Sequence, residues 1–278
     1  MMNKNNRRLA VIQDISGLGR CSLAAALPVL CVMGAQCCPV PTAVFTNQTG
    51  FSRFASLDCE VLLRQFPAIW KEHGVALDGI YTGFMSSVGQ LEAVRAMIEA
   101  FRGPESLLVV DPVMGDDGKR YPCFDEGFCR AMRSFAARAD VITPNVTEAC
   151  LLTGTPYSFF AAQDEADQLE LLRRMCRALP PRRIVVTGWR WGGSIRNFAC
   201  DGDGFSIYES PAVEGSWSGT GDLFASALCG GLLRGERLDA SIRRAMRFLE
   251  ACLADAARLA CPKEEGVPFE RHLKELMS

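Results

Sequence analysis

Short runs of β-branched residues alternate with longer segments of helical period along this chain, and that alternation is the feature that most limits its fold. The runs predict strands at residues 9–15, 37–45, 78–83, 106–113, 139–145 and 182–188. Helical periods cover residues 23–34, 57–73, 89–101, 127–139, 163–179, 221–233 and 238–260. Strands separated by helices pair in parallel. We therefore predict a three-layer α/β fold, with a mostly parallel central sheet and helices on both faces.

The domain organisation follows from length and from the absence of a dividing segment in the sequence. Residues 194–200 and 204–210 interrupt the alternation and predict an antiparallel hairpin. The 278 residues contain no internal repeat, low-complexity segment or Pro/Ser-rich linker. We predict a single domain over residues 1–278, with residues 1–7 as a flexible N-terminal segment.

The charge balance limits the kinds of partner. A formal net charge of −2 and a pI near 5.8 give no basic surface for nucleic acid or for an anionic membrane. The N-terminal sequence lacks the apolar core of a signal peptide, and no apolar run is long enough to cross a bilayer. We expect a cytoplasmic protein that binds small molecules.

Cysteine and histidine usage excludes several enzyme classes. The 13 cysteines lie scattered in apolar runs without a CxxC pair, which is typical of reduced core thiols. The two histidines, His73 and His272, occur in charged segments that predict exposed helical faces. Neither pattern supports a zinc hydrolase or a Ser-His-Asp hydrolase.

Polar residues lie in the last positions of most predicted strands or directly after them. They are Asp14, the segment 46–50, the segment 111–118, Asn145 with Glu148, and Gly188. In open α/β sheets, ligands bind at the carboxyl ends of the strands. Asn145 and Glu148 also fit a helix cap and its capping-box acid, so each residue alone is a weak signal. Their joint position at one edge favours a binding site.

The stretch Glu214 to Gly235 carries the clearest chemical signal. Gly219, Thr220 and Gly221 precede a predicted buried helix, and Asp222 lies at its start. An ordinary helix cap by Thr220 or Asp222 is one interpretation. The other is an anion hole, where small residues let a phosphate approach the N–H groups of the helix start. Asp222 would then take a proton from a substrate hydroxyl, as a small-molecule kinase requires.

Two common nucleotide-binding motifs are absent. The turn Gly17-Leu18-Gly19 has Ser22 where a dinucleotide fingerprint has its third glycine. The segment 115–120 has neither the spacing nor the context of a Walker loop. An ATP site in this chain must therefore use another scheme.

Four segments together resemble the ribokinase-like small-molecule kinases, specifically their vitamin B6 branch. They are FTNQTGF at 45–51, DPVMGD at 111–116, TPNVTE at 143–148 and GTGDLFA at 219–225. The resemblance implies a ribokinase-like fold. It also implies ATP-dependent phosphorylation of the 5′-hydroxymethyl group of pyridoxal, pyridoxamine or pyridoxine, in vitamin B6 salvage. Members of this family are often homodimers, so we expect a homodimer.

The resemblance also implies roles for individual residues. Asp222 would be the catalytic base, with Gly219, Thr220 and Gly221 around the transferred phosphate. The residues expected near ATP and its Mg²⁺ are Asp111, Asp116, Asn145, Glu148, Thr187 and Gly188. Asp111, Thr143, Glu148 and Thr187 occupy positions that help to hold a monovalent cation, expected to be K⁺. The substrate side would include Asp14, Thr49, Phe84 and Tyr121, and Asp116 and Tyr121 would lie in a segment that covers the site.

Three positions depart from the vitamin B6 kinase pattern. Asp14 replaces the usual serine, Phe84 a tyrosine and Gln48 a histidine, all on the expected substrate side. The turn 14–17 is also similar to the DxSGG turn of hydroxymethylpyrimidine kinases. Two alternatives stay open: a hydroxymethylpyrimidine kinase of thiamine biosynthesis or salvage, and a non-catalytic ligand-binding protein on the same fold. The intact GTGD and TPNxxE motifs argue against a silent protein.

Overall fold

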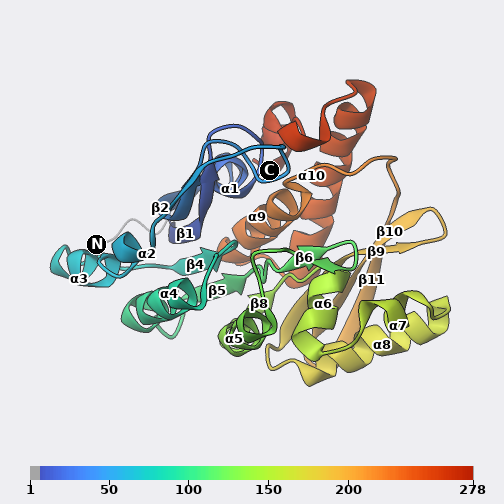
Figure 1. Ribbon diagram of the computed structural model, residues 1–278, viewed down its shortest axis with the longest axis horizontal. Coiled ribbons are helices and arrows are strands. Elements are labelled where there is room, and N and C mark those ends of the chain that lie inside the picture. The colour runs from blue at the N-terminus through green and yellow to red at the C-terminus, as the bar shows by residue number, and fades with distance from the viewer. Residues whose placement is uncertain (1–6, 278) are drawn as a thin grey trace. The chain divides into compact units, whose positions relative to one another are not determined.

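The computed structural model describes residues 7–277, which divide into two compact units (Figure 1). The first unit contains the chain up to Met85, Glu92–Leu107, and the chain from Val213. The second contains Ser86–Leu91 and Leu108–Ala212. Most of the segment predicted to be a flexible N-terminus lies outside the described residues, but Arg7 is the first residue of a strand. The single domain stays a prediction.

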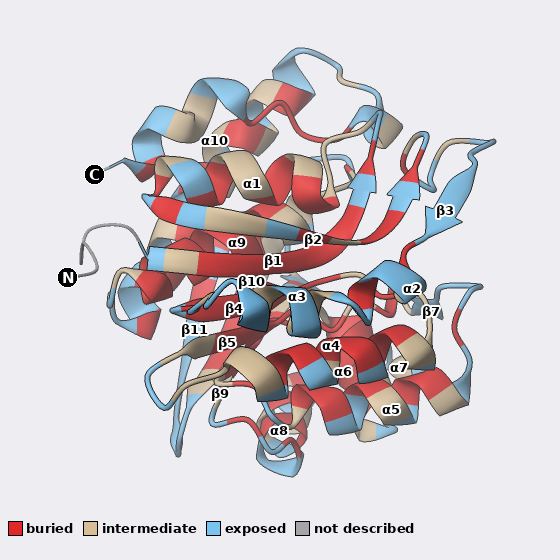
Figure 2. Cartoon of the chain, turned by 90° about the vertical axis from the view of Figure 1, so that its left-hand side faces the viewer, coloured by how far each residue is buried: buried red, intermediate tan, exposed pale blue. Residues whose placement is uncertain are grey.

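The sheet of the first unit is built on β1 (Arg7–Ser16). It pairs in parallel with β2 (Ala35–Phe45) and β4 (Gly79–Thr82), and β3 (Ser56–Asp58) runs antiparallel to β2. β1 is buried along most of its length, whereas β3 is exposed (Figure 2). The pairing of β1 with β2 shifts register between Gln13 and Ile15. Such irregularities re-aim side chains, and here the irregularity falls at Asp14.

The helices of the first unit pack on this sheet and on one another. They are α1 (Ser22–Val32), α2 (Glu60–Leu63), α3 (Phe66–Glu72), most of α4 (Val88–Phe101), α9 (Thr220–Leu233) and α10 (Leu238–Arg258), followed by the 3₁₀ helices η1 (Lys263–Glu265) and η2 (Glu270–Leu276). α1 packs on β1, β2 and α9, and α9 lies beside α10 (Figure 1). α9 is buried from Leu223 to Leu233, as expected for a helix that is apolar on every side.

One predicted helix is wrong in part. The segment 57–73 was expected to be a single helix, but Leu57 lies in β3, and α2 and α3 are separate. Pro67 lies at the start of α3, and proline favours a helix start because it lacks the N–H that a helix interior requires.

The second unit repeats the α/β pattern. β5 (Leu107–Val110), β8 (Val141–Ile142) and β9 (Arg183–Trp191) are parallel, and β10 (Ser194–Asp201) and β11 (Gly204–Pro211) form the predicted antiparallel hairpin. The helices are α5 (Glu126–Ala136), α6 (Val146–Thr153), α7 (Tyr157–Ala161) and α8 (Glu165–Ala178). Parallel strands and packed helices in both units confirm the α/β class.

A small hairpin in the second unit escaped prediction. β6 (Gly115–Asp116) pairs with β7 (Lys119–Arg120), and its turn residues Asp117 and Gly118 both have positive φ. An Asp-Gly pair of this kind is the usual sequence of a two-residue hairpin turn.

Other expectations from composition have mixed outcomes. Within residues 7–277 no helix is long and apolar enough to span a membrane. All 13 cysteines are free thiols, as predicted, but the expectation that most lie in the core is wrong: six are buried, and Cys31 and Cys123 are exposed. The prediction for His272 is wrong: its side chain is largely buried and contacts Asp255 at 3.1 Å and Glu275 at 2.8 Å. Those two carboxylates supply partners that a charged sequence segment alone does not reveal.

Candidate active site

The residues predicted for the site fall into two groups, one in each compact unit. The first unit carries the start of α9 and the end of β1. The second carries the segments that follow β5 and β8, together with Thr187 and Gly188, which lie within β9 because this strand continues to Trp191 and does not end at the predicted residue 188.

The start of α9 is shaped by two glycines with different surroundings. Gly219 is the N-cap with a φ of 82°, and a Cβ built there would lie 1.9 Å from the carbonyl oxygen of Arg20. Only glycine fits this conformation and this close approach. A Cβ on Gly221 would meet no atom within 4 Å. The ordinary cap by Thr220 or Asp222 is therefore wrong, because Gly219 caps α9 without a side-chain hydrogen bond.

Asp222 lies in the first turn of α9 and is half-buried. Its Oδ2 accepts a hydrogen bond of 2.8 Å from the backbone N–H of Ser22. Removal from water raises the pKa of Asp222 from 3.8 to about 7; the Ser22 N–H opposes the rise, and nearby Asp14 adds to it. A carboxylate with a pKa near 7 is well matched to accept a proton at neutral pH.

Asp14 is a second buried acid in the same unit. It is 5% exposed, and the hydroxyl of Ser16 donates to its Oδ2 at 3.4 Å. Burial raises the pKa of Asp14, while hydrogen bonds from the side chains of Ser22 and Ser16 lower it. The same environment raises the pKa of the Cys21 thiol to about 12, through burial and through the charges of Asp222 and Asp14. Cys21 is therefore a neutral thiol and no nucleophile.

The remaining predicted substrate-side residues of the first unit differ in exposure. Thr49 is exposed, and Phe84 is half-buried and packs edge-on against Phe45 at 6.2 Å. Gln48 is buried, with its Oε1 accepting from Gly50 N–H at 2.7 Å and its Nε2 donating to Glu264 at 3.0 Å. Both ends of this amide are used inside the protein, so Gln48 shapes its loop.

In the second unit, two acids are buried together with a hydroxyl. Asp111 is 7% exposed and Glu148 4%, and Thr143 Oγ1 donates to Asp111 Oδ1 at 3.1 Å. Burial, and then the charge of Asp111, raise the pKa of Glu148 well above its usual range. Carboxylates and hydroxyls are the oxygen ligands that Mg²⁺ and K⁺ prefer. A cation beside this pair would offset the repulsion between the two acids.

Asn145 and Glu148 form the predicted capping box at the start of α6. Asn145 Oδ1 accepts from Glu148 N–H at 2.9 Å, and Glu148 Oε2 accepts from Asn145 N–H at 2.8 Å. Asn145 Nδ2 also donates to Gly115 at 2.8 Å, and Met114 N–H donates to Glu148 Oε1 at 3.1 Å. The TPNVTE segment therefore ties the DPVMGD segment to α6.

The other predicted nucleotide residues lie nearby in the same unit. Thr187 N–H donates to Pro144 at 2.9 Å, beside the isolated bridge between Asn145 and Thr187. Gly188 is exposed, with a φ of 73°. Asp116 and Tyr121 are exposed on the β6–β7 segment, and Gly118 N–H of this segment donates to Thr147 at 2.8 Å. The structure thus brings Asp111, Asn145, Glu148 and Thr187 together.

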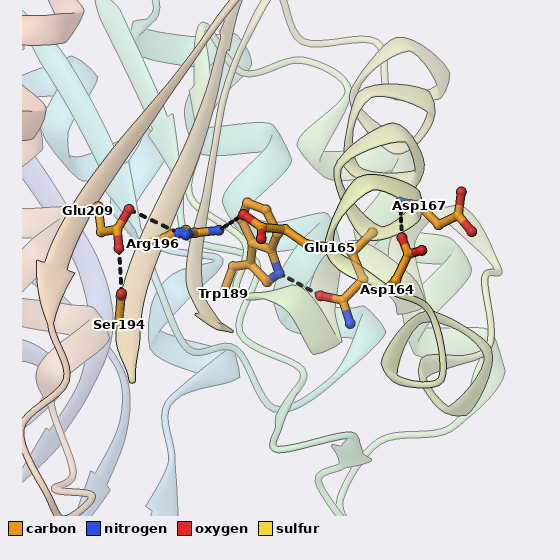
Figure 3. A network of polar contacts seen from close by, with 8 residues as sticks. Asp164, Glu165, Asp167, Trp189, Ser194, Arg196 and Glu209 are labelled. Atoms are coloured by element: carbon orange, nitrogen blue, oxygen red, sulfur yellow. Dashed lines mark hydrogen bonds and ion pairs between the residues drawn. The ribbon is translucent and has the colours of Figure 1, made fainter. Parts of the chain in front are cut away.

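A polar network at the far end of β9 has a structural role. Trp189 is buried, and its Nε1 donates to Gln168 at 2.6 Å. Arg196 lies over the Trp189 ring and contacts Glu165 and Glu209 (Figure 3). These residues fix α8 against β9 and β10.

Sequence reasoning missed Ser16 and Ser22. Ser22 starts α1, follows an N-cap residue with no side-chain hydrogen bond, and has a φ of 48°. The sequence carried no signal for the contact of Ser22 with Asp222, because Ser22 directly precedes the predicted helix 23–34 and is itself an ordinary N-cap residue.

Comparison with known proteins adds evidence independent of this geometry. A family model described as phosphomethylpyrimidine kinase matches residues 22–266. A crystal structure from Bacteroides thetaiotaomicron, described as a phosphomethylpyrimidine kinase, is 34% identical with a TM-score of 0.94, covering 100% of this chain and 96% of that one. The pyridoxal kinase of Lactobacillus plantarum is 30% identical with a TM-score of 0.88, covering 98% and 96%.

Curated relatives include kinases for both ring systems. Pyridoxal kinase PdxY of Deinococcus radiodurans is 28% identical, over 91% of this chain and 88% of its own. The bifunctional thiamine biosynthesis protein ThiED of Geobacter sulfurreducens is 30% identical over 93% of this chain. The chain spans 50% of the ThiED protein and 57% of a relative from Schizosaccharomyces pombe.

The two glycines of the α9 start should respond oppositely to alanine. Gly219→Ala should lower the free energy of unfolding by at least about 2 kcal/mol, because it combines a positive φ with a steric clash. Gly221→Ala should be neutral or stabilising by up to about 1 kcal/mol, because a helical glycine is replaced where space is open. Urea denaturation of both variants checks this, and equal destabilisation would contradict it.

Proposed function

The chain belongs to the phosphomethylpyrimidine kinase family, and from that premise we propose that it transfers the γ-phosphoryl group of ATP to the 5′-hydroxymethyl group of a vitamin B6 vitamer. Asp222 carries this proposal. It is a carboxylate with a pKa near 7, held at a helix start beside the open space at Gly221. Such a group can take the proton of the attacking hydroxyl while helix N–H groups bind the transferred phosphate.

In this proposal the nucleotide binds to the second unit. Asp111, Glu148 and Thr143 would supply oxygen ligands. Asn145 follows β8, and Thr187 and Gly188 lie within β9. Mg²⁺ would arrive with the ATP phosphates and neutralise their charge, and K⁺ would lie beside Asp111, Thr143 and Glu148. Within the described chain no group of three His, Cys, Asp or Glu side chains is placed to hold a metal by itself. That arrangement suits Mg²⁺, which proteins bind through one or two carboxylates plus substrate phosphates.

The known relatives support two candidate substrate rings, the pyridine of vitamin B6 and a pyrimidine. The Lactobacillus and Deinococcus relatives are pyridoxal kinases, and a second crystal form of the Bacteroides protein was obtained with pyridoxal. Hydroxymethylpyrimidine is the second candidate, favoured by the family description and by the Geobacter relative. Asp14 distinguishes this chain from the usual vitamin B6 pattern in either case.

We also propose that the protein is a cytoplasmic homodimer acting in vitamin B6 salvage. Support for the dimer comes from exposed apolar side chains on three successive elements of the first unit, β3, α2 and α3: Leu57, Val61, Leu62 and Ile69. Apolar groups gathered on a surface are typical of protein–protein contacts.

A substrate panel tests the reaction. ATP-dependent phosphorylation of pyridoxal, pyridoxamine, pyridoxine and hydroxymethylpyrimidine is measured in parallel, with Mg²⁺ and K⁺ present. We expect turnover of the B6 vitamers and at least about a hundredfold loss in Gly221→Ala, whose methyl group would occupy the space of the phosphate. If only hydroxymethylpyrimidine is turned over, it replaces the vitamin B6 vitamers as the proposed substrate. ATP binding without turnover of any alcohol would support the non-catalytic alternative.

The raised pKa of Asp222 predicts a pH dependence. Below about pH 7 the carboxyl is protonated and cannot accept the hydroxyl proton, so kcat/KM should fall about tenfold per pH unit there and level off above. The pH at which this acid limb of the kcat/KM profile begins should stay the same when the alcohol is changed, because the group that titrates is on the enzyme and not on the substrate. A kcat/KM that stays flat down to pH 5 would contradict Asp222 as the base.

Asp14 should set a preference for a cationic substrate. The described ion pairs include none to this buried carboxylate, and buried charges are normally paired, so a protonated amine on the substrate would complete it. Asp14→Asn should lower kcat/KM for pyridoxamine roughly 10- to 100-fold relative to pyridoxine. Ser16→Ala, which keeps the charge, should change this ratio less than about threefold. An equal loss for both vitamers in Asp14→Asn would refute the preference.

A further inference from the structure

We propose that Ser22 is a positioning residue for Asp222, acting through its strained backbone; this inference rests on the proposed role of Asp222 as the base. Ser22 is one of three non-glycine residues with positive φ in the described chain, the others being Asp117 and Ala260. The left-handed region costs an ordinary residue about 1–2 kcal/mol. Strain of this kind persists only where the surrounding structure holds it.

The strained conformation is what aims the Ser22 N–H. This N–H lies at the start of α1, where the N-cap Cys21 offers no side-chain acceptor and the first turn holds no acidic residue. Asp222 Oδ2 accepts it at 2.8 Å, from a helix 200 residues further along the chain. Asp222 therefore caps α1 while it sits in the first turn of α9. One carboxylate is held by two helix starts, and both helix dipoles favour its charged form.

The neighbouring backbone prevents the segment before Ser22 from moving away. Gly219 approaches the carbonyl of Arg20 so closely that a Cβ would overlap it. The backbone N–H of Arg20 also donates to the carbonyl oxygen of Glu265 at 3.0 Å, and the N–H of Ser218 donates to the carbonyl oxygen of Lys263 at 3.2 Å. The η1 turn therefore ties the segment before α1 and the segment before α9 together. Ser22 has little freedom to leave its strained conformation.

All charged and titratable groups reported beside Asp222 belong to the first unit. Asp14 raises its pKa, and the Ser22 N–H lowers it. Cys21 stays a neutral thiol beside both acids. The hydrogen bond from Ser22 is thus the contact that keeps the Asp222 pKa from rising further. It also leaves Oδ1, which accepts no hydrogen bond from the described chain, to meet a substrate hydroxyl.

The test varies the backbone preference at position 22 while keeping its N–H. Ser22→Gly and Ser22→Asn tolerate positive φ, so both should leave the acid limb of kcat/KM in its wild-type place. Both also remove the Ser22 hydroxyl that hydrogen-bonds Asp14, so they are the reference for that loss. Ser22→Val disfavours positive φ and should weaken the bond to Asp222. Loss of a hydrogen bond to a charged group raises the carboxyl pKa, so the acid limb of kcat/KM should move up by about one pH unit. Activity of Ser22→Val should therefore recover at pH 9 relative to pH 6.

Ala260→Val is the matched control. Ala260 has a φ of 49° and is exposed after α10, so this change should lower stability while leaving the acid limb in place. The Asp222 carboxyl pKa is also measured without substrates by ¹³C NMR, assigned through Asp222→Asn. A pKa unchanged in Ser22→Val overturns the proposal. If the Asp222 pKa is raised in Ser22→Val but the wild-type protein phosphorylates no alcohol, the role of Ser22 in positioning Asp222 is supported and the proposed function is rejected.

Discussion

The close packing of two backbone segments, the start of α9 and the turn before α1, is the constraint on which the position of Asp222 depends. Gly219 lies against the carbonyl of Arg20, and that contact brings the N–H of Ser22 within 2.8 Å of Asp222. A side chain at position 219 would force the segments apart. The carboxylate is thereby fixed before any substrate arrives, which is the condition for efficient proton transfer.

Three acids, Asp14, Asp222 and Glu148, lie at positions where burial of the carboxyl group lowers the stability of the fold at neutral pH. Burial raises the pKa values of Asp14, Asp222 and Glu148, because the ionised form of each carboxyl group is less favourable in the folded chain than in water. A group with a raised folded pKa stabilises the fold only below its ordinary pKa, and that contribution is lost as pH rises through the folded value. At neutral pH these acids therefore oppose folding. Retaining them makes sense if bound cations, substrate amines and substrate hydroxyls interact with these carboxyl groups.

Much of the fold could be predicted from sequence, and the reasons differ by element. Parallel strands were predictable because buried strands are continuous apolar runs, and the α6 cap was predictable because Asn145 and Glu148 have the capping-box spacing. The break between α2 and α3 and the β6–β7 hairpin are short and local, and periodicity is weak over such lengths. The contact of Ser22 with Asp222 joins residues 200 positions apart, and Ser22 is itself an ordinary N-cap residue, so the sequence carried no signal for it.

In the proposed reaction, Asp222 acts in the chemical step and not in binding. The most direct measurement is single-turnover phosphoryl transfer by wild type and Asp222→Asn, with ATP and vitamer affinities of both proteins measured by calorimetry. We expect the transfer rate to fall by at least about a thousandfold in Asp222→Asn, while both dissociation constants change less than about fivefold. A variant that transfers phosphate at nearly the wild-type rate, or one that loses only affinity, would contradict it.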